Sequence, residues 1–397
     1  YFRAPHSYTG EDMFELNLHG SYSVVSAVSR ALTRRGMRLA EAGEFTKRAF
    51  LNGKMDLVQA DAVMDLINAE TRRGASAALE QLEGGLSRRI GAIEEKLLDF
   101  ASELAAAMDY PEEMEDEVLS AAPEVLNSAI SRIRDLIDNG NCNKIIREGA
   151  KLAILGRPNV GKSSLLNALM NAERAIVTSI AGTTRDVLEE KIDLLGLPVR
   201  IADTAGIHET GDAVEKIGIE RALHEAASAE CVLLLFDGSA GITQEDERLV
   251  QKVFGMNCRN IIFLINKCDL PDCGTAAEQL KNIASENVGS ISRISCRTGF
   301  GLDELKHRIA EAVGLSEGRA IVTNERHIEC LSAACAELCE AAELFSKGGN
   351  AAEMLLPQTE LVAESVGNAL HCLGEISGRE VSKELLDRIF ERFCVGK

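Results

Sequence analysis

The chain has 397 residues, of which 46% are hydrophobic and 4% aromatic, and its formal net charge is −19. This length favours two or three domains. The negative charge argues against a nucleic acid held by bulk electrostatics, so contact with RNA would need a local basic patch or a partner subunit. Apolar runs such as Cys231–Phe236 are far too short to span a bilayer. We therefore expect a soluble, cytoplasmic protein with no membrane contact.

The 11 cysteines are scattered and include no C-x-x-C pair, which favours reduced thiols in a cytoplasm over a disulfide framework or a metal site. The chain opens at Tyr1, inside a segment that already has a structured pattern. We interpret it as a fragment without its original N-terminus.

The first 50 residues are expected to mix strand and helix, with a strand at Met13–Leu18 and a helix at Ser23–Arg35. From about residue 51, apolar residues recur at three- and four-residue steps, the period of an amphipathic helix. Tyr110-Pro111 and the acidic residues that follow are predicted to interrupt this pattern. A further helix is predicted over Pro123–Asn139, where an Asn-Gly pair would end it.

Between about residues 149 and 314 short apolar strands alternate with helices, which is typical of an α/β domain with a largely parallel sheet. Leu195–Pro198 has the pattern of a hairpin turn, so one strand should run antiparallel to the others. The predicted strands are Lys151–Leu155, Lys191–Leu195, Val199–Asp203, Cys231–Asp237, Ile261–Asn266 and Ile291–Ser295.

After the α/β domain the helical pattern returns, rich in Ala and Leu. We expect the α/β domain to be inserted into one all-helical domain, because neither flank alone offers a comfortable helical core. The alternative is two unrelated helical domains. The predicted domains are a partial N-terminal domain at 1–50, a first helical half at 51–148, the α/β domain at 149–314 and a second helical half at 315–397.

Residues 156–163 read Gly-Arg-Pro-Asn-Val-Gly-Lys-Ser and match the phosphate-binding pattern G-x-x-x-x-G-K-[ST]. The glycines let backbone N–H groups face phosphates, Lys162 adds a positive charge, and the Ser163 hydroxyl is a ligand for Mg²⁺. A predicted strand precedes the loop, and a predicted helix at Ser164–Met170 follows with its anion-binding N-terminus. This context supports a true phosphate loop over a chance match.

Asn266-Lys267-Cys268-Asp269 selects the base. The Asp269 carboxylate accepts hydrogen bonds from guanine N1–H and the exocyclic amine, which adenine does not offer, and such pairing can discriminate by roughly 10⁴ or more. The Lys267 stem can cover the base face. Ser295-Cys296-Arg297 would complete the pocket with a backbone N–H to guanine O6. The motifs together predict GTP as the nucleotide and a Ras-like P-loop GTPase fold for the α/β domain.

Two further segments complete the predicted site. Asp203 is placed to reach Mg²⁺ through water, and the Gly206 N–H to meet the γ-phosphate. Of Thr183 and Thr184, one hydroxyl can bind Mg²⁺ while the γ-phosphate holds the loop, and we favour Thr184. The residues expected to bind GTP are Asn159, Val160, Gly161, Lys162, Ser163, Ser164, Thr178, Ser179, Ile180, Ala181, Gly182, Thr183, Thr184, Asp203, Thr204, Ala205, Gly206, Asn266, Lys267, Asp269, Ser295, Cys296 and Arg297.

Ile207 holds the place where many small GTPases carry a Gln that orients the attacking water. Glu215, which opens a predicted helix, either takes over this role or only complements the helix dipole. Arg185 is either an internal arginine finger or half of a surface ion pair. The Asn159 side-chain carbonyl offers a place for a monovalent cation instead. The downstream candidates for orienting water are His208, Glu209, Asp212 and Glu215.

Essentially the whole chain resembles the MnmE family of tRNA-modifying GTPases, also called TrmE. The segments that carry the resemblance are Pro5-His6-Ser7-Tyr8-Thr9-Gly10-Glu11-Asp12, Gly43-Glu44-Phe45-Thr46-Lys47-Arg48-Ala49-Phe50-Leu51-Asn52-Gly53-Lys54, Ala181-Gly182-Thr183-Thr184-Arg185-Asp186, Ile217-Gly218-Ile219-Glu220-Arg221-Ala222 and Phe393-Cys394-Val395-Gly396-Lys397.

The resemblance implies an α+β folate-binding and dimerising N-terminal domain, here partial, a helical domain and an inserted GTPase (G) domain. It also implies a homodimer in which K⁺-dependent pairing of G domains accelerates GTP hydrolysis. With a FAD-dependent MnmG-type partner in a hetero-oligomer, such proteins add an aminomethyl-type group, such as carboxymethylaminomethyl, to carbon 5 of the tRNA wobble uridine. The carbon comes from a tetrahydrofolate derivative, 5-formyl- or methylene-tetrahydrofolate.

The resemblance also assigns roles to particular residues. Glu215 would orient the water and Cys394 would serve the modification chemistry, although the Cys394 thiol could instead be buried at a helix end. The implied ligands are Ser163 and Thr184 for Mg²⁺, Asn159, Thr178, Ile180 and Thr183 for K⁺, and Glu15, Lys54 and Lys397 for the folate.

The competing function is a GTPase switch that controls ribosome assembly without chemistry on RNA. That class usually carries a second G domain or a Gly-x-x-Gly RNA-binding module, whereas this chain ends in Ala/Leu helices and a Cys-Val-Gly-Lys tail. A membrane iron-transport GTPase is disfavoured because long apolar spans are missing.

Overall fold

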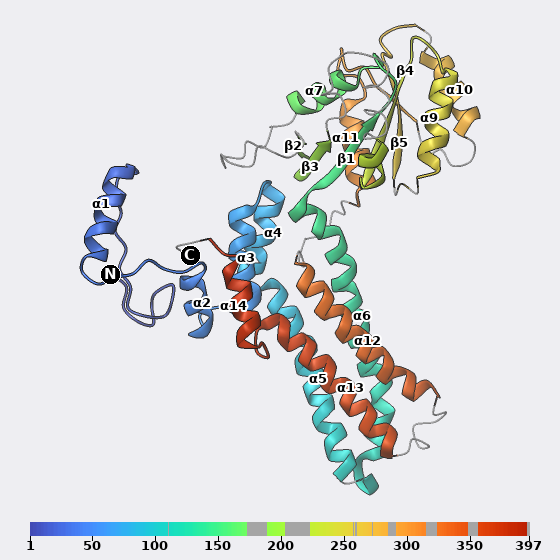
Figure 1. Cartoon of the computed structure of the whole chain (residues 1–397). Coiled ribbons are helices and arrows are strands. Elements are labelled where there is room, and N and C mark those ends of the chain that lie inside the picture. The colour runs from blue at the N-terminus through green and yellow to red at the C-terminus, as the bar shows by residue number, and fades with distance from the viewer. Residues whose placement is uncertain are drawn as a thin grey trace. The chain divides into compact units, whose positions relative to one another are not determined.

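The computed structural model describes residues 1–109, 111–172, 189–202, 223–256, 258, 260–271, 273–284, 291–314, 324–347 and 356–394 (Figure 1). They form two compact units. The helical unit comprises residues 1–68, 76–141 and 321–397, and the sheet unit comprises residues 69–75 and 142–320. None of the helices in the described ranges combines the length and apolar composition that crossing a bilayer requires.

The sheet unit is built on one six-stranded sheet with the order β2-β3-β1-β4-β5-β6. The β2–β3 pair is antiparallel and the other pairs are parallel, so the predicted hairpin is confirmed. The strands are β1 (Ala150–Leu155), β2 (Glu189–Leu194), β3 (Leu197–Ala202), β4 (Cys231–Asp237), β5 (Ile261–Asn266) and β6 (Ser292–Arg293).

Helices cover both faces of this sheet, with α7 and α11 on one face and α9 and α10 on the other (Figure 1). The apolar run Cys231–Phe236 in β4 is buried throughout, as expected for a central parallel strand with both faces covered. The helices are α7 (Lys162–Ala172), α9 (Gln244–Phe254), α10 (Cys273–Ala284) and α11 (Leu302–Ala312).

One prediction about the cysteines is wrong. Cys268 and Cys273 are joined by a disulfide, whereas the scattered pattern predicted reduced thiols throughout. Their five-residue spacing is not a metal or redox motif, and only the turn from β5 into α10 brings the two side chains together.

The predicted strand Ile291–Ser295 is also shorter in the structure, where β6 has two residues.

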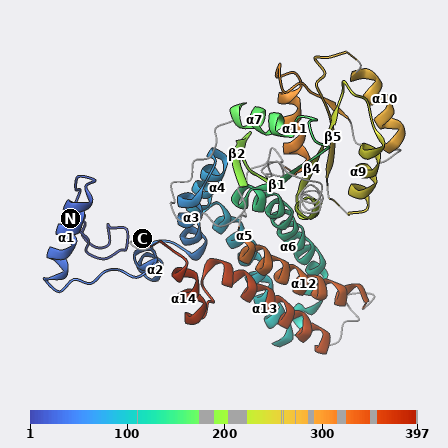
Figure 2. The same ribbon diagram turned by 45° about the horizontal axis from the view of Figure 1, so that its top comes forward.

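Four long helices form the main core of the helical unit, and they lie side by side in Figure 2. Two precede the sheet unit in the chain and two follow it. They share one apolar cluster in which Leu97 and Leu104 join Leu331, Leu338 and Val366, all fully buried. The two flanks therefore build one helical core and not two separate ones. The helices are α5 (Gly85–Asp109), α6 (Pro111–Glu148), α12 (Glu325–Lys347) and α13 (Leu356–Ser377).

Helix α6 differs from the sequence prediction. It runs unbroken from Pro111 to Glu148, so the acidic residues at 112–117 do not interrupt it and Asn139-Gly140 does not end it. Proline fits the first helical position because its missing N–H is not needed there. Acidic residues are favourable near the N-terminus of a helix, because the helix dipole is positive there. A single Gly costs a helix only about 1 kcal/mol relative to Ala.

The remaining helices belong mostly to the N-terminal part of the chain. They are α1 (Tyr22–Thr33), α2 (Glu44–Leu51), α3 (Leu57–Asn68), α4 (Arg72–Leu82) and, near the C-terminus, α14 (Lys383–Glu391). The predicted strand Met13–Leu18 is wrong. Met13 makes a single bridge to Phe2, and Phe14 and Leu16 are each about half exposed, at 51% and 53%. A strand needs a neighbour's hydrogen bonds along its length, and the described residues supply only this bridge.

Candidate functional site

The phosphate loop lies between β1 and α7. Gly161 has a φ of 105°, and a Cβ built on it would lie 2.3 Å from Nδ2 of Asn266, so this position admits no side chain. Lys162 starts α7, and its Nζ donates hydrogen bonds of 2.8 Å to the carbonyls of Gly156 and Arg157. An ammonium group beside a helix N-terminus is an arrangement suited to phosphates.

Asn266, the last residue of β5, links three of the predicted motifs. Its Nδ2 donates to the carbonyl of Val160 in the phosphate loop at 3.0 Å, and its Oδ1 accepts from the N–H of Cys296 at 3.1 Å. The residue is 3% exposed. Both polar ends of the amide are therefore satisfied within the protein. Asn266 does more than end a strand, because it fixes the base-selecting segment Asn266–Asp269, here called the base loop, against the phosphate loop.

Lys267 also connects the base loop to the phosphate loop. It adopts a positive φ of 64°, and its Nζ donates to the carbonyl of Asn159 at 3.1 Å and to Oδ2 of Asp237 at 2.5 Å. Burial alone would raise the pKa of Asp237, but hydrogen bonds from Lys267 and Ser239 outweigh it and hold the pKa below its usual value. The carboxylate is therefore ionised opposite the ammonium.

Sequence reasoning missed Asp237. A signal was available, because Asp237 is the first polar residue after the apolar run of β4, at the carboxyl edge of a parallel strand where α/β proteins bind ligands. Asp246 was missed as well. It is fully buried and accepts a 2.8 Å hydrogen bond from Nε of Arg157 in the phosphate loop. Its signal was the capping-box pattern Thr243-x-x-Asp246 at the start of α9.

Asp269 is held as an acceptor. Its Oδ1 accepts a 2.7 Å hydrogen bond from the Ser295 hydroxyl, and its Oδ2 lies 4.0 Å from Nη1 of Arg297. The Ser295 hydrogen bond, more than the charge of Arg297, lowers the pKa of Asp269. Burial, assisted by the nearby Asp269 charge, raises the pKa of the Cys296 thiol to about 11. The base loop thus presents an ionised carboxylate next to a neutral thiol, which suits a base with two adjacent N–H donors.

Several predicted site residues lie outside the described part of the chain. They are Thr178, Ser179, Ile180, Ala181, Gly182, Thr183 and Thr184 of the first switch, Asp203, Thr204, Ala205, Gly206 and Glu215 of the second, and the terminal Lys397.

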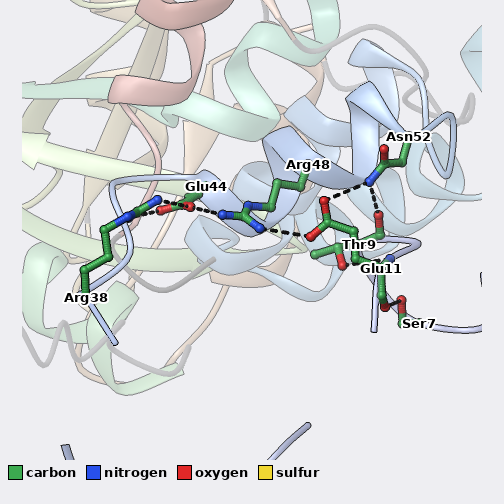
Figure 3. Close-up of polar contacts among 7 residues, drawn as sticks. All are labelled: Ser7, Thr9, Glu11, Arg38, Glu44, Arg48 and Asn52. Atoms are coloured by element: carbon green, nitrogen blue, oxygen red, sulfur yellow. Dashed lines mark hydrogen bonds and ion pairs between the residues drawn. The ribbon is translucent and has the colours of Figure 1, made fainter. Parts of the chain in front are cut away.

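The two N-terminal segments that carry the family resemblance contact each other (Figure 3). Arg48 of α2 donates to Glu11 at 2.9 Å, and the Asn52 amide donates to the carbonyl of Thr9 at 2.8 Å. Arg38 makes two hydrogen bonds to Glu44, of 2.7 and 2.6 Å. The Arg38 bonds, followed by further bonds that include one from Arg48, lower the pKa of Glu44 to about 2. Residues 5–12 and 43–54 therefore form one polar network.

The C-terminal cysteine lies against the start of α2. The Gly43 N–H donates to the carbonyl of Cys394 at 3.2 Å, while the Cys394 residue itself is exposed. Phe390 and Phe393 before it are buried, with ring centroids 4.9 Å apart, and Phe50 of α2 lies 6.4 Å from the Phe390 ring. The alternative of a buried helix-end thiol is therefore wrong for Cys394.

The described folate candidates, Glu15 and Lys54, each belong to a segment that is neither helix nor strand. Lys54 donates to the carbonyl of Pro5 at 2.9 Å, which brings it to the 5–12 segment. Glu15 is exposed and follows the bridge residue Met13. Lys54 is thus tied to the N-terminal network.

The sheet order, the phosphate loop and the guanine-type base loop define a P-loop GTP hydrolase whose nucleotide domain interrupts a helical domain. The profile of the MnmE helical domain matches residues 57–394, and that of the N-terminus of the GTP-binding protein TrmE matches residues 1–54. The tRNA modification GTPases MnmE of Alkaliphilus oremlandii and Aquifex aeolicus are 40% and 42% identical over 404 residues, covering 100% of this chain and 84% and 86% of theirs. The chain belongs to the MnmE family of tRNA modification GTPases.

Solved structures similar to this chain each cover less than half of it. Era of Aquifex aeolicus bound to GDP·AlF4− is 25% identical, with a TM-score of 0.35, and covers 47% of this chain and 66% of its own. The G domain of the T. maritima FeoB iron transporter is 24% identical, with a TM-score of 0.30, and covers 41% of this chain and 98% of its own.

Proposed function

We propose that this chain couples GTP hydrolysis to modification of carbon 5 of the tRNA wobble uridine, by adding a carboxymethylaminomethyl-type group together with a FAD-dependent MnmG-type partner. The relatives that match the whole chain are named tRNA modification GTPases. The observation that carries the proposal is the exposed Cys394, whose carbonyl is bonded to Gly43 at the edge of the N-terminal network. An exposed thiol therefore lies beside the start of the 43–54 segment.

In the helical unit, we propose that the tetrahydrofolate derivative is bound by Glu15, Lys54 and Lys397. Lys54 supports this role because its hydrogen bond to Pro5 keeps its ammonium beside the 5–12 segment. Cys394 takes part in the modification chemistry from the adjacent tail. Residues 1–54 match the TrmE N-terminal profile, which is consistent with a folate-binding and dimerising role for this segment.

In the sheet unit, we propose that Mg²⁺ is bound by Ser163 and Thr184. The proposed K⁺ ligands are Asn159, Thr178, Ile180 and Thr183. The described part of the chain fits a bound Mg²⁺, because Ser163 lies in the first turn of α7 next to Lys162, and its hydroxyl is an oxygen ligand of the kind that Mg²⁺ takes. Bound Mg²⁺ supplies charge stabilisation to the phosphate oxygens. Lys162 holds the phosphates, Asp269 orients the guanine and Glu215 orients the attacking water.

Mass analysis of wobble uridine tests the tRNA part of the proposal. Cells that lack the protein should lose the modified nucleoside, and expression of the wild-type protein should restore it. A Cys394→Ser variant should fail to restore it, while Cys258→Ser, which changes a half-buried thiol of the sheet unit, should succeed. Normal uridine modification in cells without the protein would refute the proposal and favour a ribosome-assembly role.

GTP turnover in different salts tests the ion part of the proposal. The purified dimer should turn over GTP much faster in K⁺ than in Na⁺ at equal ionic strength. Glu215→Ala should abolish turnover and leave GTP affinity intact, because the residue acts on water and not on the nucleotide. Equal rates in the two salts would remove the role of K⁺.

A further inference from the structure

The loop that carries Asp269 also carries two cysteines. Cys268 and Cys273 form a disulfide, with their Cα atoms 5.3 Å apart. Cys268 lies two residues after the end of β5, next to Lys267, and Cys273 is the first residue of α10. Asp269 therefore lies inside the ring that the disulfide closes. Eight other cysteines whose side chains the structure describes are free thiols.

Both ends of this ring are anchored to the sheet unit. The Cys268 N–H donates to the carbonyl of Ile294 at 3.1 Å, next to Ser295. Cys273 belongs to the buried core under α9 and α10. It packs closely against Gly238, because a Cβ built on Gly238 would lie 3.4 Å from the Cβ of Cys273. Between these anchors residues 269–271 are exposed, with Leu270 at 42%. A covalent bond between the anchors therefore restricts the exposed part of the loop, which holds Asp269.

We propose that Cys268 and Cys273 form a thiol–disulfide modification site that sets how fast the guanine nucleotide leaves. Asp269 presents both carboxylate oxygens to the base only while it keeps its contacts with Ser295 and Arg297. Closing a short ring around Asp269 removes competing loop conformations, and a pre-organised site binds more tightly for that reason. Reduction opens the ring and leaves only the two anchors. Nucleotide then dissociates faster from the dithiol form than from the disulfide form.

The oxidant for this site is a low-molecular-weight disulfide such as oxidised glutathione. The half-buried Cys268, as the thiolate, attacks one sulfur of the oxidant, and one glutathione thiolate leaves. The thiolate of Cys273 then attacks Cys268 in this mixed disulfide, and the second glutathione leaves. The protein loses two electrons and two protons, and the two glutathione molecules gain them. Excess thiol reverses both steps.

Nucleotide dissociation from the full chain tests this site. The protein would be treated with oxidised or reduced glutathione, and release of a fluorescent GDP analogue would be followed. Peptide mapping after differential alkylation would report the state of the pair. After oxidation we expect peptide mapping to recover the disulfide-linked Cys268–Cys273 peptide. After reduction we expect the GDP analogue to be released about threefold to tenfold faster. Failure of the pair to form under excess oxidised glutathione would overturn the proposal, as would equal release rates from mapped disulfide and dithiol protein.

Variants locate the effect. Cys268→Ser and Cys273→Ser should each release nucleotide at the reduced wild-type rate in both conditions. Cys258→Ser is the matched control, because it removes another half-buried thiol of the sheet unit and should keep the full response. A response that persists in Cys273→Ser would assign the effect to another thiol. If the serine variants do not fold, the mapped wild-type comparison alone still decides the question.

Discussion

The backbone N–H of Gly43 donates a 3.2 Å hydrogen bond to the carbonyl of Cys394, although about 350 residues separate them in the chain. A side chain at position 43 would disturb this contact. A Cβ there would lie 2.8 Å from Cβ of Phe393 and 2.9 Å from the carbonyl of Phe390. The close approach of α2 to the C-terminal aromatic residues therefore depends on glycine, whose φ here is 62°.

Gly43→Ala should loosen the C-terminus. We expect a loss of about 1–3 kcal/mol in the free energy of unfolding of the helical unit, because the substitution adds left-handed strain and a backbone clash. Hydrogen exchange at residues 390–394 should increase. Gly53→Ala is the matched control, since Gly53 also has a positive φ, of 67°, but faces open space. If both variants lose the same stability and protection, the clash with the C-terminus is not the cause.

Gly161→Ala should remove GTP binding. The new methyl group would lie 2.3 Å from Nδ2 of Asn266, so either the phosphate loop or the hydrogen bond from Asn266 to Val160 must shift. We expect GTP affinity, measured by calorimetry, to fall by at least about 100-fold, because misplaced backbone donors lose several phosphate contacts. Gly274→Ala, in the open first turn of α10, should bind GTP normally. Tight binding by Gly161→Ala would contradict the observed packing of the loop.

Asp269→Asn should weaken GTP binding by roughly 100-fold or more, since a site built on hydrogen bonding rejects a poor partner strongly. The amide nitrogen of Asn would face the N–H donors of guanine, and the interaction with Arg297 would weaken. Binding of GTP and of xanthosine triphosphate would be compared, because xanthine replaces the amine by a carbonyl that Asn can donate to. Asp303→Asn, at a side chain 93% exposed on α11, is the control. Unchanged GTP affinity in Asp269→Asn would show that another group selects the base.

Glu44 should make the stability of the helical unit sensitive to acid. Its pKa is lowered from the ordinary 4.5 to about 2, so its ionised form is favoured in the folded state. The contribution is fully present above pH 4.5 and is lost as the pH falls through about 2. Denaturant unfolding of wild type and Glu44→Gln should therefore differ most above pH 4.5 and converge in acid. The exposed Glu304→Gln should show no such convergence, and a constant Glu44→Gln difference across this range would exclude the effect.

The sequence pattern predicts the sheet unit well, for a physical reason. Central parallel strands are buried on both faces, so β4 and β5 appear as unbroken apolar runs with the bounds found in the structure. The phosphate loop and base loop depend on local chemistry and are equally visible. The sequence does not show that Asn266 bonds Val160 or that Lys267 bonds Asp237, because those partners meet only when parallel strands are set side by side.

The N-terminal part was harder to predict. Met13–Leu18 has the alternating pattern of a strand, but alternation does not supply a hydrogen-bonding neighbour. The pairing of Arg48 with Glu11 and of Gly43 with Cys394 joins residues far apart in sequence, and neither residue type indicates its partner. The family-specific character of residues 5–12, 43–54 and 393–394 is explained only once the structure places these segments in contact.

The helical core has a consequence for biosynthesis. Helices α5 and α6 leave the ribosome before the sheet unit, and α12 and α13 leave after it. The apolar stripes of the first pair, including Leu97 and Leu104, therefore wait for their partners Leu331 and Val366 until more than 200 further residues have been translated. The sheet unit, being contiguous apart from residues 69–75, can fold in that interval. Any chaperone that attends this nascent chain would meet the unpaired first helices as its substrate.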